Sequence, residues 1–383
     1  MANFKTAVES LQEDILKYLT RMVNMESPSH EKSRVDAVID VLEASFRHLG
    51  FRTRRLPQRA FGNHLVADMN EGQGPRILLV GHADTVYPLG TLERMPLKKE
   101  GNLLMGPGVQ DMKGGLTVML FGTKIFLDAA GSLEGAIRIV VNSDEEPGSP
   151  TSRNQWKDLV QDVDYAMIFE PAKSDGAMVY RRKGVGIFKV DVTGKAAHAG
   201  AEPEKGASAI RVLAQKILDI ESLADPRCGT TVNTGVIEGG TEPYVVPESA
   251  GAKIDIRIPS IAEKNRILKS LQSIVQREDL PGTRAKLSGQ FHRPPMEPAE
   301  GFESFRHLVE QEGQALGLCV LWADITGGAS DGNNISALAV PTIDGMGPSG
   351  GGAHSPEEYM DISSLFHKTA LLAAVLNRIV GKK

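Results

Sequence analysis

The sequence predicts an α/β protein: a domain with a mostly parallel β-sheet, interrupted by a smaller inserted α+β domain of the ferredoxin-like type. Three observations support this prediction. Short apolar runs alternate with helical patterns through residues 1–182, which is typical of a parallel sheet covered by helices. The order β-α-β-β-α-β follows within residues 183–293, as in a ferredoxin-like sandwich. An α/β pattern then resumes over residues 294–383, so the smaller domain is inserted into the larger one.

The first part of the chain opens with amphipathic helices and continues with short strands. Leu11, Ile15 and Leu19 recur at helical spacing, and Gly50 is a suitable stop for the second helix. Residues 77–80 (ILLV) are four apolar residues ended by a glycine, which is typical of a buried parallel strand. The expected helices cover about 11–23, 31–49 and 114–130, and the expected strands cover 52–56, 64–69, 77–80, 136–142 and 165–169.

The inserted domain is predicted from a strand with alternating side chains near residues 185–192 and from the elements that follow it. Residues 291–295 (FHRPP) are expected to form the linker by which the chain leaves this domain. The expected elements from here to the end are helices at 206–220, 261–277 and 302–316 and from 362 onward, and strands at 185–192, 230–237, 252–258, 284–287, 319–322 and 340–343.

The composition excludes several classes of function. Hydrophobic residues make up 41% and charged residues 24% of the 383 positions, as in ordinary globular proteins, and a net charge of −5 gives no support for nucleic-acid binding. Cys228 and Cys319 stand far apart, which predicts neither a disulfide framework nor a cysteine zinc site. No stretch resembles a signal peptide or a spanning helix. We therefore expect a cytoplasmic protein that binds neither nucleic acid nor membrane.

Residues that can carry chemistry follow the carboxyl ends of the expected strands. They are His82, Asp84, Asp111, Glu145, Glu146, Glu170 and His354. In open α/β sheets this edge is where ligands bind. Histidines combined with several carboxylates suit two divalent ions, preferably zinc, and two neighbouring ions need a shared carboxylate. Adjacent side chains diverge, so one of Glu145 and Glu146 can bind metal while the other acts as a base.

Each of these residues taken alone has a simpler interpretation. Glu145 and Glu146 would form a solvated turn, and His354 would be a polar residue of a glycine-rich loop. Arg257 would be a solvent-facing strand residue or one half of a salt bridge. Residues 345–350 (GMGPSG) formally fit a dinucleotide-binding fingerprint, but Pro348 and the glycines after it prevent the helix that the fingerprint requires. A glycine-rich substrate loop leading to His354 is the preferred interpretation.

Taken together, the motifs resemble those of the zinc-dependent carboxypeptidase and aminoacylase family, which includes glutamate carboxypeptidase, succinyl-diaminopimelate desuccinylase and acetylornithine deacetylase. The resemblance rests on residues 81–86 (GHADTV), 106–115 (GPGVQDMKGG), 144–147 (DEEP), 170–171 (EP), 194–200 (GKAAHAG) and 354–358 (HSPEE). The glutamate carboxypeptidase branch is the most similar, through residues 84–87 (DTVY) and 198–203 (HAGAEP).

This resemblance implies a role for each metal-site residue. It places His82 and Glu170 on one zinc ion and Glu146 and His354 on the other, with Asp111 bridging the two ions. Glu145 would act as general base and acid toward water at the metal centre, and Asp84 would orient the imidazole of His82.

The resemblance also implies roles for the inserted domain, which would act as a dimerisation or lid domain. His198 would stabilise the oxyanion and would come from the partner subunit of a homodimer. Asn233 and Arg257 would hold the substrate, the guanidinium gripping a terminal carboxylate. Gly328 lies in residues 327–331 (GGASD), which are similar to a family loop near the substrate.

The implied activity is carboxypeptidase-type hydrolysis of an amide or peptide bond next to a free carboxylate, in a small peptide or N-acyl amino acid. Two Zn²⁺ would be the cofactors, although Co²⁺ or Mn²⁺ could occupy the same ligands. An N-acyl-amino-acid deacylase of the acetylornithine deacetylase or desuccinylase type is the alternative. A non-catalytic metal-binding scaffold is a distant one, because Glu145 is intact. The basic residue that selects a glutamate side chain has no clear match, so the recognised side chain stays open.

Overall fold

The computed structural model describes residues 4–70, 74–130 and 132–382, and the chain divides into two compact units. The first unit comprises Met1–Tyr180, Pro298–Asp324 and Ser330–Lys383, and the second comprises Arg181–Glu297 and Ile325–Ala329. The sequence pattern predicted the insert at 183–293 and placed residues 325–329 in the larger domain. This short segment lies instead with the second unit, because Thr326 accepts a hydrogen bond from the backbone N–H of Lys183 and donates one to the carbonyl of Arg181.

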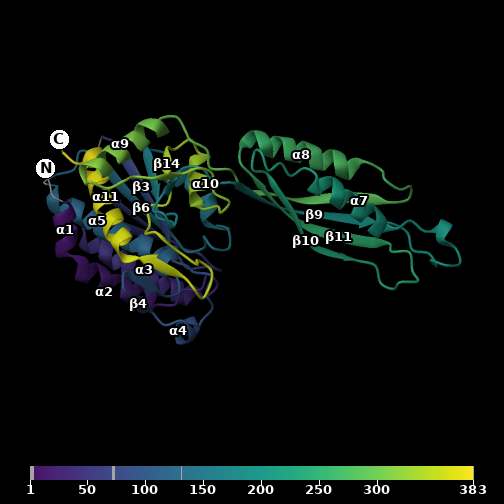
Figure 1. The fold of residues 1–383 in the computed structure, drawn as a ribbon, viewed down its shortest axis with the longest axis horizontal. Coiled ribbons are helices and arrows are strands. Elements are labelled where there is room, and N and C mark those ends of the chain that lie inside the picture. Colours follow the sequence, from purple (N-terminus) through teal and green to yellow (C-terminus); the bar gives the residue numbers. More distant parts are fainter. Residues whose placement is uncertain (1–3, 71–73, 131, 383) are drawn as a thin grey trace. The chain divides into compact units, whose positions relative to one another are not determined.

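A six-stranded sheet with the order β1-β2-β6-β3-β7-β14 forms the centre of the first unit (Figure 1). Its strands are β1 Arg52–Leu56, β2 His64–Met69, β3 Arg76–His82, β6 Ala136–Asn142, β7 Tyr165–Ile168 and β14 Thr342–Ile343. Strands β6, β3, β7 and β14 run parallel, and β1 and β2 pair antiparallel at one side. The predicted mostly parallel α/β fold is confirmed, and the carboxyl ends of β3, β6 and β7 meet at one edge.

Helices cover both faces of this sheet. They are α1 Phe4–Ser10, α2 Gln12–Val23, α3 Lys32–His48, α5 Gly115–Ala129, α6 Trp156–Leu159, α9 Phe302–Ala315, α10 Asp331–Ser336 and α11 Ile362–Val380, and a short α4 spans Thr91–Arg94 in a loop. Leu79 of β3 belongs to the core cluster shared with α5 and α11, whereas Leu78 and Val80 belong to the cluster containing Trp156 and Ile335. Because both faces are buried, β3 is continuously apolar from Ile77 to Val80 rather than alternating.

Very short strands form two further sheets that the sequence analysis did not predict. Strands β4 Lys98–Glu100, β5 Leu103–Met105, β15 Gly350–Gly351 and β16 Tyr359–Asp361 form an antiparallel sheet, and β8 Met178–Val179 pairs with β13 Trp322–Ala323. The expected strand at 319–322 is thereby reduced to β13. Strands of two or three residues carry no periodicity that a sequence could reveal. The antiparallel sheet brings the loop after β5 beside the loop that joins β15 to β16.

The second unit has the predicted order β-α-β-β-α-β. Its elements are β9 Gly184–Thr193, α7 Ala209–Glu221, β10 Thr231–Gly239, β11 Ser249–Ile258, α8 Ile261–Gln276 and β12 Arg284–Arg293. The strands form an antiparallel sheet with the order β10-β11-β9-β12, and α7 and α8 lie on one face of it (Figure 1). Phe188, Ile254 and Ile256 belong to the apolar core of this unit. The ferredoxin-like prediction is therefore confirmed.

The predicted exit linker at residues 291–295 is wrong at its first three positions. Phe291 and Arg293 belong to β12, where they pair with Gly186 and Val185 of β9. Gly289, at a φ of 97°, interrupts the alternation of side chains in β12. The alternating pattern in the sequence therefore predicted a strand that ends before β12 does.

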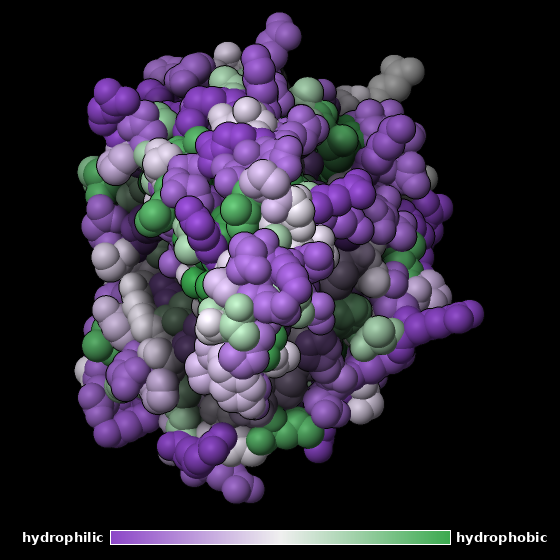
Figure 2. Space-filling model, turned by 90° about the vertical axis from the view of Figure 1, so that its right-hand side faces the viewer, coloured by the Kyte–Doolittle hydropathy of each residue, from purple (hydrophilic) through white to green (hydrophobic). Residues whose placement is uncertain are grey.

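The described residues contain no helix that combines the length and the apolar character needed to cross a membrane. One face of the molecule is shown in space-filling form in Figure 2. Hydrophilic residues predominate on that face, and hydrophobic residues are scattered among them. Such scattering is usual for a water-facing surface.

Candidate metal centre

His82 ends strand β3 with a fully buried imidazole. Its Nδ1 lies 2.9 Å from the backbone carbonyl oxygen of Asp84, and its Nε2 lies 3.2 Å from Oδ1 of Asp111 and 3.8 Å from Oε1 of Glu170. Because a carbonyl only accepts hydrogen bonds, Nδ1 carries the proton and Nε2 is left as a ligand atom. The strand therefore presents a correctly oriented metal-binding nitrogen.

Asp111 lies between the two histidines that the sequence singled out. It belongs to the segment Val109–Gly114 that precedes α5, and its own backbone there is not helical, with φ −113° and ψ 93°. Its Oδ1 faces Nε2 of His82 at 3.2 Å, and its Oδ2 faces Nε2 of His354 at 3.2 Å. The same His354 nitrogen lies 3.2 Å from Oε2 of Glu146. Each oxygen of this carboxylate thus faces a different imidazole, which is the arrangement expected of a ligand shared by two ions.

Asp84 joins His82 to the turn that carries the two glutamates. Its Oδ1 lies 3.4 Å from Nδ1 of His82, farther away than its own backbone carbonyl. The carboxylate accepts the backbone N–H of Glu145 and of Glu146, each at 3.3 Å, and the hydroxyl of Ser29 at 2.7 Å. The sequence assigned Asp84 only to the imidazole, but its side chain also fixes the Glu145–Glu146 turn.

The glutamates follow β6 and β7 and reach the same place. Glu145, Glu170 and His82 are all buried, and each offers an atom that lies within 4.8 Å of the others. His82, Asp111 and Glu146 form a second group of this kind. The structure thus brings together all five predicted metal ligands and the predicted base.

The electrostatics of this cluster fit a pair of cations. Burial and the charge of Asp111 raise the pKa of Glu146 to about 8, and the same two causes raise the pKa of Glu170 well above its ordinary value. Oε1 of Glu146 is buried without a hydrogen-bond partner among the described residues. Several buried carboxylates with too few donors are costly unless positive charge compensates them. The donor set of two imidazoles and bridging and terminal carboxylates suits zinc.

Glu358 is a residue of this site whose role the sequence did not reveal. It is completely buried, and its Oε1 accepts the backbone N–H of Gln110 at 2.8 Å and of Asp111 at 3.0 Å. Its Oε2 accepts the N–H of Gly108 at 2.9 Å and the hydroxyl of Tyr87 at 2.6 Å. Glu358 therefore fixes the loop that carries Asp111. Its place four residues after a histidine was visible, but its backbone partners are about 250 positions away.

Replacing Glu358 with glutamine should weaken metal binding about 10- to 100-fold, the usual effect of losing a group that orients a ligand. The new amide would place its own N–H₂ against buried N–H groups that need an acceptor. Metal affinity is measured by competition with a chelating dye. Glu357→Gln, at the exposed neighbouring position, is the matched control. Equal affinity for Glu358→Gln and wild type would contradict this role.

His198 belongs to the second unit and is exposed. The backbone N–H groups of Gly200 and Ala201 donate to its Nδ1 at 3.2 and 3.0 Å. Since Nδ1 accepts, the neutral imidazole carries its proton on Nε2. His198 therefore presents an N–H donor at its outer end, which is the group that an oxyanion needs.

The other predicted substrate residues also lie in the second unit. Asn233 of β10 and Arg257 of β11 stand on adjacent strands, where Asn233 pairs with Asp255. Nε of Arg257 donates to Oδ1 of Asp255 at 2.8 Å. The carbonyl of Gly328 accepts a hydrogen bond from the guanidinium of Arg182 at 3.1 Å. The side chain of Arg257 is 33% exposed, and its hydrogen bond to Asp255 holds the guanidinium in a fixed direction.

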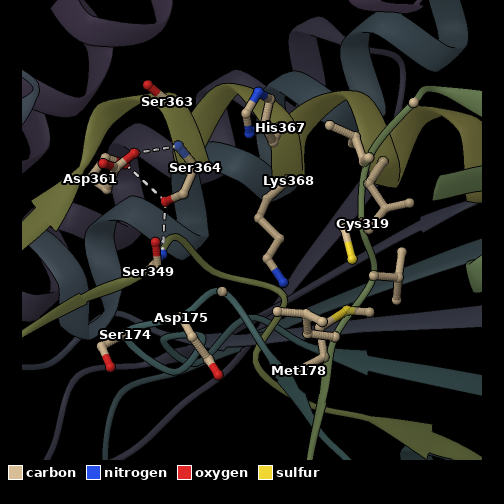
Figure 3. A pocket seen from close by; sticks show the side chains of 16 residues that line it. Ser174, Asp175, Met178, Cys319, Ser349, Asp361, Ser363, Ser364, His367 and Lys368 are labelled. Atoms are coloured by element: carbon tan, nitrogen blue, oxygen red, sulfur yellow. Dashed lines mark hydrogen bonds between the residues drawn. The ribbon is translucent and has the colours of Figure 1, made fainter. Parts of the chain in front are cut away.

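A cavity of about 410 Å³ in the first unit involves none of the predicted metal ligands (Figure 3). Lys368 of α11 points into it, and Cys319 lies on a neighbouring segment that also lines it. The ammonium of Lys368 is buried and donates to the carbonyl of Gly345 at 3.0 Å. No acidic side chain among the described residues forms an ion pair with it, and burial lowers its pKa to about 7.

Lys368→Met should raise the thermal unfolding midpoint at pH 6 and leave it nearly unchanged at pH 10.5. The folded protein holds Lys368 neutral above pH 7, whereas the unfolded chain stays protonated up to about pH 10.5. Burial of this amine therefore lowers the free energy of unfolding by its full amount below pH 7. This destabilisation decreases by about 1.4 kcal/mol per pH unit as the pH rises from 7 to 10.5. A difference in unfolding midpoint between the variant and the wild type that stays constant from pH 6 to pH 10.5 would contradict the lowered pKa of Lys368.

Comparison with known proteins places this geometry in a family. A model of peptidase family M20/M25/M40 matches residues 78–378. Carboxypeptidase G2 of Pseudomonas sp. (strain RS-16) is 29% identical over 381 residues, covering 97% of this chain and 91% of that protein. Succinyl-diaminopimelate desuccinylase of Maricaulis maris is 26% identical over 369 residues, covering 89% of this chain and 90% of that protein.

Solved structures share the fold. A tripeptidase from Staphylococcus aureus aligns with a TM-score of 0.81 at 22% identity, covering 96% of this chain and 98% of that chain. A Bacillus subtilis protein described as a dinuclear metal binding peptidase from the M20 family aligns with a TM-score of 0.72 at 14% identity, covering 97% and 99%. Identities this low are informative about architecture alone.

Proposed function

Because this chain belongs to peptidase family M20/M25/M40, a family of metal-dependent peptidases and amidohydrolases, we propose that it is a dizinc carboxypeptidase-type enzyme. Its substrates are small peptides or N-acyl amino acids, cleaved at the amide bond next to a free carboxylate. The observation that carries this proposal is Asp111, whose two oxygens each face a different imidazole at 3.2 Å.

Two groups of ligands would hold the two ions. His82 and Glu170 would bind one ion, His354 and Glu146 would bind the other, and Asp111 would contact both. When bound, the ions supply Lewis acidity for the scissile carbonyl and the attacking water. Zinc is the preferred metal for this set of donors, and cobalt or manganese could replace it.

Glu145 would move the proton. It is buried beside His82 and Glu170, but the family resemblance assigns it no metal. Its carboxylate would accept a proton from the attacking water and return that proton to the leaving nitrogen. Asp84 keeps Glu145 in place through the backbone N–H that it accepts at 3.3 Å.

The second unit would bind the substrate and complete the site. Arg257 would grip the free carboxylate of the substrate, with Asp255 holding the guanidinium in direction. Asn233 and the loop at Gly328 would contact the same part of the substrate. His198 would donate its Nε2 proton to the oxyanion.

A substrate panel tests the proposed reaction. Zinc-loaded protein is incubated with dipeptides, N-acyl amino acids and matched amides in which the free carboxylate is replaced by a carboxamide, and the released amine is quantified. Turnover of carboxylate substrates with loss of turnover for the carboxamides is expected. Peptides that outperform acylated amino acids would favour a carboxypeptidase over a deacylase. No turnover across the panel with zinc or cobalt would overturn the proposal.

The second unit would also form a homodimer in which each subunit supplies His198 to its partner's site. β10 is an edge strand of its sheet, and its Val236 and Ile237 are exposed by 50% and 63%. Exposed apolar residues on a sheet edge are suited to pairing with another chain.

A mixing experiment tests this exchange of His198. His198→Ala and Glu145→Gln should each be nearly inactive alone. Mixed dimers would contain one complete site, so an equilibrated mixture should recover about a quarter of the wild-type activity. The mixture should show no recovery if His198 serves the site of its own subunit, and a monomeric protein in solution would contradict the dimer directly.

A further inference from the structure

A groove on the first unit borders the metal centre and has no assigned role. Its volume is about 430 Å³, and Glu146 forms part of its wall. Three prolines and two aliphatic residues make up most of the remaining lining. These five residues, which we call the proline groove, are Pro28, Pro88, Pro147, Val86 and Leu89.

The proline groove leaves apolar side chains uncovered. Val86 and Leu89 are exposed by 41% and 42%, and both lie in the loop that follows His82 and Asp84. Removing side chains of this size from water lowers the free energy of the complex with a ligand that covers them. An apolar surface next to a reaction centre is the usual form of a small-molecule subsite.

Hydrogen bonds hold the groove in shape before any ligand binds. The carboxylate of Glu26 accepts the backbone N–H of Gly90 and of Leu92, each at 2.9 Å, which fixes the loop after Leu89. On the other wall, the backbone of Thr85 is bonded to the segment around Pro28. A groove of this kind requires little ordering when it is filled, so apolar contact is converted efficiently into affinity.

The charges around the groove decide which end of the substrate it takes. The lining contains Glu31 and Glu146 but no lysine or arginine. The carboxylate end of a substrate would find no cationic side chain in this lining, and it has its proposed partner in Arg257. The groove therefore suits the opposite, uncharged side of the scissile bond.

We infer that the proline groove is the subsite for the acyl side of the substrate, and that it selects aliphatic or aromatic acyl groups. This inference rests on the proposed function and specifies its substrate class. A substrate with a longer apolar acyl group would bury Val86 and Leu89, and a formyl or acetyl group would leave both exposed. Free energy from one buried methylene corresponds to about a fourfold change in kcat/KM.

The test is a series of N-acyl derivatives of one amino acid, from acetyl through butanoyl and hexanoyl to benzoyl, assayed with the zinc-loaded full-length protein. We expect kcat/KM to rise about fourfold per methylene, and the hexanoyl-to-acetyl ratio to fall in Val86→Thr and Leu89→Asn. Leu338→Asn, a change at an equally exposed leucine of the first unit, should keep the wild-type ratio. Calorimetric binding of the same compounds to Glu145→Gln protein gives the ratio without turnover.

A flat acyl series in the wild type, or variants that keep the wild-type ratio in both measurements, would overturn the groove assignment. The proposed hydrolase function would survive either result, because the substrates would still be cleaved. Turnover of no member of the series, together with no binding, would overturn the proposed function and the groove with it.

Discussion

Asp111→Ala is expected to remove bound metal and abolish hydrolysis. Asp111 contacts both His82 and His354, at 3.2 Å on each side. Without it, the remaining ligands form two separate and incomplete sets. The ions that would neutralise buried carboxylates such as Glu146 and Glu170 would then bind less tightly. We expect the bound zinc to fall well below two ions per chain and the turnover to fall at least as far as the roughly 10²–10⁴-fold effect of a lost general base.

Elemental analysis after dialysis and the substrate assay measure these two effects. Asp128→Ala is the matched control, since Asp128 is an exposed aspartate on the neighbouring helix α5. Circular dichroism shows that both variants are folded. A variant at Asp111 that retains two tightly bound ions would contradict its position between them.

Glu145→Gln is expected to lower kcat about 10²–10⁴-fold while the metal content stays at the wild-type level. The amide has nearly the same shape as the carboxylate but cannot accept the proton of the attacking water. The backbone N–H that Asp84 accepts is unchanged, so the turn remains in place. This variant distinguishes a general base from a metal ligand, because the loss of a ligand would lower the metal content as well as kcat.

Metal analysis and steady-state kinetics are measured on the same preparation, with Glu93→Gln, at an exposed position, as the control. Retention of full activity would refute Glu145 as the base. Loss of metal together with activity would instead identify Glu145 as a ligand.

The residues that the sequence could place are those that follow regular elements. A run of four apolar residues predicted β3, and its parallel neighbours β6 and β7 follow from the same reasoning. Once three parallel strands share an edge, the side chains after them must converge. His82, the Glu145–Glu146 pair and Glu170 therefore meet for topological reasons.

Other contacts of the site could not be read from the sequence because they are made by the backbone. Glu358 holds Asp111 through N–H groups, which every residue except proline possesses and which leave no mark in a sequence. His82 is oriented more closely by the carbonyl of Asp84 than by its side chain. The left-handed backbone of His354, at a φ of 65°, is similarly invisible in the residue type, because such strain is held by the surrounding loop.

The length of β12 was hidden for a different reason. Its pairing with β9 continues to Arg293, although Gly289 removes one side chain from the alternating pattern. The strand is stabilised by hydrogen bonds to a neighbour about one hundred positions earlier, which a local pattern does not contain.

In the proposed reaction, two metal ions held by the Asp111 cluster are required for hydrolysis. The most direct test is to strip the protein with a chelator, add Zn²⁺ or Co²⁺ in known equivalents, and follow both bound metal and turnover of the best substrate of the panel. Turnover should be absent at the start and should reach a plateau at two ions per chain. Turnover in the stripped protein, or a plateau reached with no metal bound at this cluster, would contradict this requirement.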